Sequence, residues 1–149
     1  MTTNNGDVLI KVEELHKIFG ELHALNGVSE EIRKGEVVVI VGPSGSGKST
    51  FIRCLNLLEQ PTSGSIIFEG KDITAKGFNV NLHRQRVGMV FQQFNLFNNL
   101  SVLENLTISQ EKVKGVSPDA AKEKAMELLS RVGLADKAEA YPAQLSGGQ

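Results

Sequence analysis

The first part of the chain alternates apolar and polar residues over two short stretches. The alternation is weak over residues 9–12 and clearer over residues 27–32, and turn-forming pairs lie nearby at Asn26-Gly27 and Lys34-Gly35. Because successive side chains of a strand point to opposite faces, a period of two predicts strands with one covered face. The turn signals favour short antiparallel strands.

Residues 37–41 read Val-Val-Val-Ile-Val and have no polar face. Such a run is typical of a strand that is covered on both sides in a parallel sheet, and we expect it to be the central strand of the fold. A glycine-rich turn follows. Residues 49–58 then place four apolar side chains on one helical stripe, which are Phe51, Ile52, Leu55 and Leu58. The pattern predicts a strand-loop-helix unit.

Two further short apolar runs, residues 65–68 and 87–91, predict two more strands. The first is preceded by the turn residues 61–64 and ended by Gly70. A second small β layer therefore follows the first helix.

Two helices are predicted in the last third of the chain. Ser101 and Glu104 have the spacing of a capping box that opens a short helix. Ser117 and Pro118 supply an N-cap and a first-turn proline for a second helix that ends before Gly133. Its apolar stripe consists of Ala121, Ala125, Leu128, Leu129 and Val132.

Length and charge limit the classes of function. A chain of 149 residues suits one domain, and 16 Lys plus Arg against 17 Asp plus Glu give a net charge of -1. No basic field exists to hold nucleic acid, so we expect no nucleic-acid partner. No apolar run approaches the ~20 residues of a membrane helix, which predicts a cytosolic or peripheral protein. The single cysteine, Cys54, is expected to be a buried structural thiol.

Residues 42–49 read Gly-Pro-Ser-Gly-Ser-Gly-Lys-Ser and match the phosphate-loop pattern G-x-x-x-x-G-K-[ST]. Gly45 and Gly47 permit positive φ, and the helix beginning near Lys48 directs its positive dipole end at the phosphates. We expect Lys48 to reach the β and γ phosphates and the Ser49 hydroxyl to coordinate Mg²⁺. The predicted nucleotide-binding residues of this loop are Ser44, Gly45, Ser46, Gly47, Lys48, Ser49 and Thr50.

Two later segments narrow the class of phosphate-loop protein. Residues 88–96 read Gly-Met-Val-Phe-Gln-Gln-Phe-Asn-Leu, and residues 145–149 read Leu-Ser-Gly-Gly-Gln. In the latter, Ser146 and Gln149 fit a capping box, while Gly147 and Gly148 leave backbone N–H groups open to an anion. With the phosphate loop, these segments resemble the ATP-binding subunits of ABC transporters.

The resemblance implies a fold class and roles for residues. The fold would be α/β, a P-loop NTPase (RecA-like) core with a small antiparallel β layer and part of an α-helical subdomain. Gln92 would contact the metal and the attacking water, and act with Lys48 in catalysis. Ser146, Gly147 and Gly148 would complete the γ-phosphate site of a second subunit in a head-to-tail dimer.

The resemblance also implies a platform for the base of ATP. In the family an aromatic residue near the N-terminus stacks on adenine, and Phe19 stands in the matching place. The alternative for Phe19 is an ordinary half-buried aromatic residue at the end of a strand. Stacking favours ATP without recognising every edge of the base.

Residues 35–40, 53–56, 102–105 and 132–142 are similar to the ATPases of polar amino acid importers. This implies ATP binding and hydrolysis that drive import, at the cytoplasmic face of the cell membrane. The implied partners are transmembrane permease subunits, a second ATP-binding subunit and, indirectly, a periplasmic or extracellular solute-binding protein. The amino acid assignment is analogy, because no residue here reads the solute.

Hydrolysis in this family also needs an Asp-Glu strand, the Walker B part, and a switch histidine, and neither follows Gln149. We therefore expect an incomplete ATP-binding domain, with the β layer and core over residues 1–100 and a helical subdomain over 101–149, that does not hydrolyse ATP by itself. His16, His23 and His83 precede the signature and are expected to be solvated or capping. A soluble non-transport ABC ATPase and a binding-only fragment remain as alternatives.

Overall fold

The structure is a computed structural model that describes residues 7–149. It divides into two compact units, Met1–Met89 and Val90–Gln149. The division falls before the boundary expected near Ser101, so the segment of Gln92 joins the helical unit; the assignment of that unit as a subdomain stays a proposal.

The first unit is built on a four-stranded antiparallel sheet with the strand order β2-β1-β3-β4. The two long strands β1 (Val8–Phe19) and β2 (Leu22–Arg33) form a hairpin, and β3 (Ser63–Phe68) and β4 (Lys71–Asp72) continue the sheet. The predicted strands at residues 9–12, 27–32 and 65–68 are confirmed, and the first two are longer than expected. The second β layer predicted after the first helix is wrong, because β3 pairs with β1 and so joins the same sheet.

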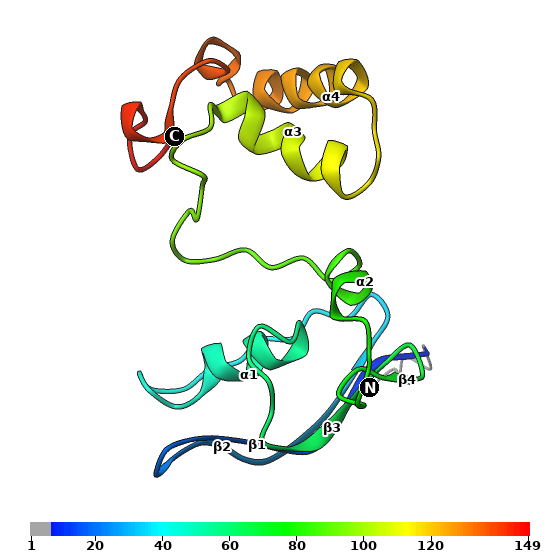
Figure 1. Ribbon diagram of the computed structural model, residues 1–149. Coiled ribbons are helices and arrows are strands. Elements are labelled where there is room, and N and C mark those ends of the chain that lie inside the picture. Colours follow the sequence, from blue (N-terminus) through cyan, green and yellow to red (C-terminus); the bar gives the residue numbers. More distant parts are fainter. Residues whose placement is uncertain (1–6) are drawn as a thin grey trace. The chain divides into compact units, whose positions relative to one another are not determined.

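The helix α1 (Lys48–Leu55) lies across one face of the curved sheet (Figure 1). The core between them contains Val12, Leu15, Leu25, Phe51, Cys54, Leu57, Ile66 and Ile73. The burial predicted for Cys54 is confirmed, and burial raises the pKa of its thiol to about 11. Phe51 is buried as predicted, but Ile52 and Leu58 are exposed, because α1 ends at Leu55 and turns only one narrow face to the sheet.

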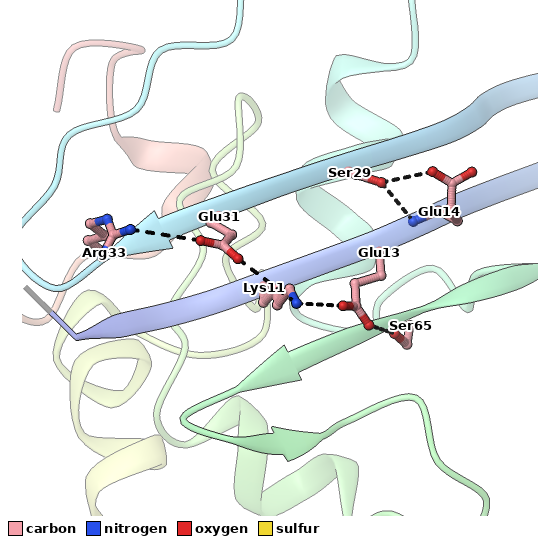
Figure 2. Close-up of polar contacts among 7 residues, drawn as sticks. All are labelled: Lys11, Glu13, Glu14, Ser29, Glu31, Arg33 and Ser65. Atoms are coloured by element: carbon pink, nitrogen blue, oxygen red, sulfur yellow. Dashed lines mark hydrogen bonds and ion pairs between the residues drawn. The ribbon is translucent and has the colours of Figure 1, made fainter.

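The other face of the sheet is charged and exposed (Figure 2). Lys11 lies 2.6 Å from Glu13 of its own strand and 3.9 Å from Glu31 of β2, and Ser65 of β3 donates to Glu13 at 3.2 Å. The helix α1 covers the apolar face of the sheet, and the charged face is exposed to water. This difference between the two faces explains the period of two along both strands.

A bulge bends β1 at Glu14, whose φ is 45°. Its backbone N–H donates to the Ser29 hydroxyl at 2.9 Å, and that hydroxyl donates to the Glu14 carboxylate at 3.1 Å (Figure 2). Gly64 of β3 packs so closely here that a Cβ would lie 2.2 Å from the Glu14 carbonyl oxygen. The bulge lets a twelve-residue strand curve around α1.

The central parallel strand predicted at residues 37–41 is not formed, nor is the strand predicted at 87–91. Residues 37–41 belong to neither a strand nor a helix and are between 38% and 88% exposed. A strand exists only through hydrogen bonds to a neighbouring strand. The sheet of the described residues is antiparallel, with no parallel neighbour for either run.

The second unit is helical. The helices α3 (Val102–Lys112) and α4 (Pro118–Arg131) pack together and are followed by the short 3₁₀ turns η1 (Ala135–Lys137) and η2 (Pro142–Gln144). Over residues 7–149, no helix is both long and apolar enough to cross a membrane.

The helix starts predicted in this unit are confirmed. Ser101 accepts from the Glu104 N–H at 3.2 Å, and Glu104 accepts from the Ser101 N–H at 2.7 Å, which completes the capping box. Ser117 caps α4, and Pro118 is its first residue. The predicted stripe of α4 is buried at Ala121, Ala125 and Leu129, whereas Leu128 and Val132 are exposed, so the stripe that packs is narrower than expected.

Candidate nucleotide-binding site

The loop of residues 42–49 leads from the apolar run of residues 37–41 into α1, which begins at Lys48. Gly45 and Gly47 have φ of 80° and 83°, as predicted from the sequence. At Gly45 an added Cβ would meet nothing within 4 Å, so the loop is open to solvent there. A helix N-terminus that follows glycines with positive φ presents backbone N–H groups and a positive dipole end, the arrangement that binds phosphate.

Gly47 joins this loop to the sheet. It is the left-handed N-cap of α1, and its carbonyl accepts from the Phe51 N–H at 2.8 Å. A Cβ at Gly47 would lie 2.2 Å from the carbonyl oxygen of Ala24 in β2. Only glycine fits this close approach, which fixes the height of the loop over β2.

Lys48 folds back over the loop. Its Nζ donates to the carbonyl oxygens of Gly42 at 2.8 Å and Pro43 at 2.6 Å, and lies 3.3 Å from the Ser46 hydroxyl. The ammonium thus lies on the loop rather than out in solvent. It adds a full positive charge to the dipole end of α1, and positive charge at a helix N-terminus favours anions.

The hydroxyl groups predicted to hold nucleotide and metal lie in the same loop and first helical turn. Ser44, Ser46 and Ser49 are exposed, and Thr50 is half-buried. Among residues 7–149 no group of three or more His, Cys, Asp or Glu side chains could hold a metal ion. Magnesium commonly takes one or two protein oxygens together with substrate phosphates and water, so the Ser49 hydroxyl beside the loop fits that mode.

A hollow of about 390 Å³ lies on the flank of the loop. Its walls are mainly apolar, and its one acidic residue is Glu30. It contains Leu25, Val28, Glu30, residues 38–41, Ser46, Gly47, Lys48 and Phe51. A triphosphate needs donors and cations, so the loop itself and not this hollow is suited to the phosphates.

Phe19 ends β1 at the tip of the hairpin, where it pairs with Leu22. Its side chain is 43% exposed, so part of the ring is accessible. Ala24, which contacts Gly47, lies two residues after Leu22 along β2. Phe19, the predicted base platform, and Gly47 of the phosphate loop therefore both lie beside the first residues of β2.

Gln92 and the signature residues belong to the second unit. Gln92 is exposed in an irregular segment, and Ser146, Gly147 and Gly148 are exposed at the end of the chain. A hollow of about 440 Å³ lies between the two segments, lined by residues 93–96, Asn98, Pro142, Ala143, residues 145–147 and Gln149. The structure brings these two segments together within one unit.

The capping box predicted at Ser146 is half formed. The Gln149 side chain accepts from the Ser146 N–H at 2.9 Å, while the Gln149 N–H donates to the Ser146 carbonyl at 3.0 Å. These bonds close a turn, and no helix of the described residues begins here. The shape of the signature segment thus depends on hydrogen bonds between residues that are three apart in the sequence.

A clamp on the far end of α1 was not foreseen from the sequence. The helix α2 (Val80–Arg84) brings His83 Nε2 within 2.9 Å of the Leu55 carbonyl oxygen. His83 is only 3% exposed and lies edge-on to Phe68 and Phe78, so the solvated alternative predicted for it is wrong and the capping one holds.

Arg84 continues this clamp. Its Nε donates to the Asn56 carbonyl at 3.2 Å and its Nη2 to the Leu57 carbonyl at 2.7 Å. The Asn56 amide in turn donates to Met89 Sδ at 3.3 Å. These bonds satisfy carbonyl groups that a helix end leaves unpaired. The adjacent residues His83 and Arg84 are a possible sequence sign of such a clamp, but the sequence alone does not show which carbonyl groups they contact.

Residues 25–149 match a protein-family model described as ABC transporter. Over 141 residues the chain is 51% identical to the arginine transport ATP-binding protein ArtM of Bacillus subtilis (strain 168), a match that covers 95% of this chain and 59% of ArtM. It is 46% identical over 141 residues to the glutamine transport ATP-binding protein GlnQ of Geobacillus stearothermophilus, covering 95% of this chain and 58% of GlnQ. The chain therefore spans less than two thirds of the length of these relatives.

A solved structure shows the same fold. The ATP-binding cassette MJ0796, in a dimeric post-hydrolysis state bound to ADP and Pi, aligns with a TM-score of 0.82 and 35% identity. The alignment covers 95% of this chain and 65% of that one. The α/β class expected for the chain is confirmed at the level of this shared fold.

Proposed function

Since the chain belongs to the ABC transporter family, we propose that the intact protein is an ATP-binding subunit that couples ATP binding and hydrolysis to import of a polar amino acid. The observation that carries the nucleotide part is the position of Lys48. Its ammonium lies on the phosphate loop at the N-terminus of α1, 2.8 and 2.6 Å from two loop carbonyls. When a nucleotide binds, a small movement of the flexible Lys48 side chain replaces these two carbonyl oxygens with phosphate oxygens as the acceptors of its ammonium.

Each residue of the loop has a part in binding. The backbone N–H groups of residues 44–50 surround the phosphates, Lys48 compensates their charge, and the Ser49 hydroxyl holds Mg²⁺. Bound Mg²⁺ supplies neutralisation of the charge that develops on the transferred phosphoryl group. Gln92 orients the attacking water, and Ser146, Gly147 and Gly148 reach the γ-phosphate of a second subunit in a head-to-tail dimer.

The dimer proposal has a basis in the chemistry of the signature. Gly147 and Gly148 are exposed, and a Cβ at either would meet nothing within 4 Å. Backbone N–H groups there can approach an anion closely. The related cassette MJ0796 is dimeric with ADP and Pi bound, which supports the same assembly for this protein.

Import of a polar amino acid is proposed from the relatives, which are named as arginine and glutamine transport ATP-binding proteins. The partners would be transmembrane permease subunits, with a periplasmic or extracellular solute-binding protein acting through them, at the cytoplasmic face of the membrane. The exposed apolar side chains Val90, Phe91, Phe94, Leu96 and Phe97 around Gln92 offer a surface for such a partner.

The test is ATP binding by the intact protein with Lys48→Ala. Loss of a charged donor to phosphate is expected to weaken binding about ten- to a hundred-fold. Lys76→Ala, at an exposed lysine of the same unit, is the matched control and should bind like the parent. Equal affinity in the Lys48 variant would overturn the account of the loop.

The transport part is tested by purifying the intact protein with its membrane subunits. ATP-dependent uptake of labelled arginine or glutamine by vesicles containing the complex is the expected result. If the protein instead purifies without membrane subunits and shows full ATPase activity alone, the soluble non-transport ATPase is the better assignment.

A further inference from the structure

The ring of Phe19 is held from one side by a neighbouring cation. Lys17 Nζ lies 4.6 Å from the centroid of the Phe19 ring, well within the distance of a cation–π contact. The Lys17 side chain is only 14% exposed. Such partial desolvation strengthens the attraction between the ammonium and the π face of the ring.

Lys17 is itself fixed by the loop that follows α1. Its Nζ donates to the Gln60 carbonyl at 2.8 Å and lies 3.3 Å from the Glu59 carboxylate. The ammonium therefore has three partners, a ring, a carbonyl and a carboxylate. It is a fixed element of the structure and not a solvated side chain.

Hydrogen bonds of the backbone also connect the loop after α1 to the end of β1. The Thr62 N–H donates to the His16 carbonyl at 2.8 Å, and the Ile18 N–H donates to the Thr62 hydroxyl at 3.0 Å. The loop after the phosphate-binding helix is thus bonded to the end of β1 on both sides of Lys17. Because α1 begins at the phosphate loop, the helix and the loop that follows it connect the two predicted parts of the nucleotide site.

We propose that Lys17 is a positioning residue for the base of the nucleotide: it covers one face of the Phe19 ring, leaves the other face for adenine, and ties that ring to the loop that follows α1. The inference rests on the proposed stacking of adenine on Phe19. A ring that is already immobilised loses less side-chain freedom when a base stacks on it, so Lys17 raises affinity without touching the nucleotide.

The experiment compares two ligands in calorimetric titrations of the intact protein. ATP engages both the ring and the phosphate loop, whereas inorganic triphosphate with Mg²⁺ engages the loop alone. Lys17→Met keeps the apolar length of the side chain and removes the charge. It should weaken ATP binding about two- to ten-fold and leave triphosphate binding unchanged, while Lys17→Arg should restore ATP binding.

Phe19→Ala separates this inference from the proposed function. If Phe19→Ala binds ATP like the parent, the stacking itself is wrong. If Phe19→Ala weakens ATP binding and Lys17→Met does not, stacking stands and the role of Lys17 is overturned. Equal losses for ATP and triphosphate in Lys17→Met would also overturn it, since they show a general effect on charge or folding.

The final comparison uses the double variant that combines Phe19→Ala with Lys17→Met. With the ring absent, Lys17→Met should have no further effect on ATP affinity. Losses that add in full would mean that the two residues act independently. Lys71→Met, at an exposed lysine of β4, is the control for removing one positive charge from this unit.

Discussion

Arg84 Nη2 lies 2.7 Å from the carbonyl oxygen of Leu57. A cation from α2 therefore holds the backbone just past the C-terminal end of α1, the helix that begins at the phosphate loop. Leu57 has a φ of 56° and is buried, a conformation that a non-glycine residue keeps only where its surroundings fix it. Arg84 supplies part of that restraint, together with its bond to the Asn56 carbonyl.

Arg84→Met is therefore expected to destabilise the protein by about 1 to 2 kcal/mol, because two carbonyl groups lose a charged donor while the apolar stem remains. The free energy of unfolding in urea measures this. Lys122→Met, at an exposed position of α4, should change stability by less than about 0.5 kcal/mol. A loss of equal size in both variants would contradict a specific role for the Arg84 bonds.

Gly47→Ala is expected to cost about 2 kcal/mol or more and to impair ATP binding. A Cβ there combines a φ of 83° with a 2.2 Å approach to the Ala24 carbonyl. The matched control is Gly77→Ala, which has a φ of 85° but nothing within 4 Å, and should cost only about 1 kcal/mol. Thermal or urea unfolding of both variants decides whether the close approach matters beyond the dihedral angle.

Ser49→Ala should reduce the gain in ATP affinity that Mg²⁺ provides, by at least about ten-fold, a loss seen even for indirect metal partners. Binding of ATP in EDTA should be nearly unchanged, since the hydroxyl acts through the metal. Ser49→Thr retains the hydroxyl and should behave like the parent. If the Mg²⁺ dependence is the same in Ser49→Ala, another oxygen holds the metal.

The buried thiol of Cys54 predicts a dependence of stability on pH. Its pKa is about 11 in the folded protein, raised first by burial, against 9.0 for an ordinary thiol. Between these values the unfolded chain releases the proton and the folded chain keeps it. The stabilisation is therefore complete below pH 9 and is lost as pH rises towards 11.

The measurement compares the parent with Cys54→Ala under reducing conditions. One pKa unit corresponds to about 1.4 kcal/mol, so the stability of the parent should fall by about 1 kcal/mol relative to the variant between pH 8 and pH 10. Other groups that titrate in this range are common to both proteins and cancel. Parallel pH profiles would show that the thiol is not desolvated in the folded state.

Local features of this protein were determined by its sequence. The capping box of Ser101 and Glu104, the proline start of α4 and the positive φ of Gly45 and Gly47 all formed as predicted. Each depends on hydrogen bonds or steric limits within a few residues of the chain. Such features need no distant partner, and the positive φ angles of Gly45 and Gly47 belong to this class, whereas the position of the loop over β2 depends on the close approach of Gly47 to Ala24.

Tertiary structure decided the features whose partners are far apart in sequence. Residues 37–41 have the composition of a buried strand but remain exposed, because a strand needs a hydrogen-bonded neighbour that no described segment provides. His83 and Arg84 reach the end of α1 across 27 to 28 residues. Lys17 contacts Gln60 across 43 residues, and that distant carbonyl, together with the Glu59 carboxylate, holds its ammonium over the Phe19 ring.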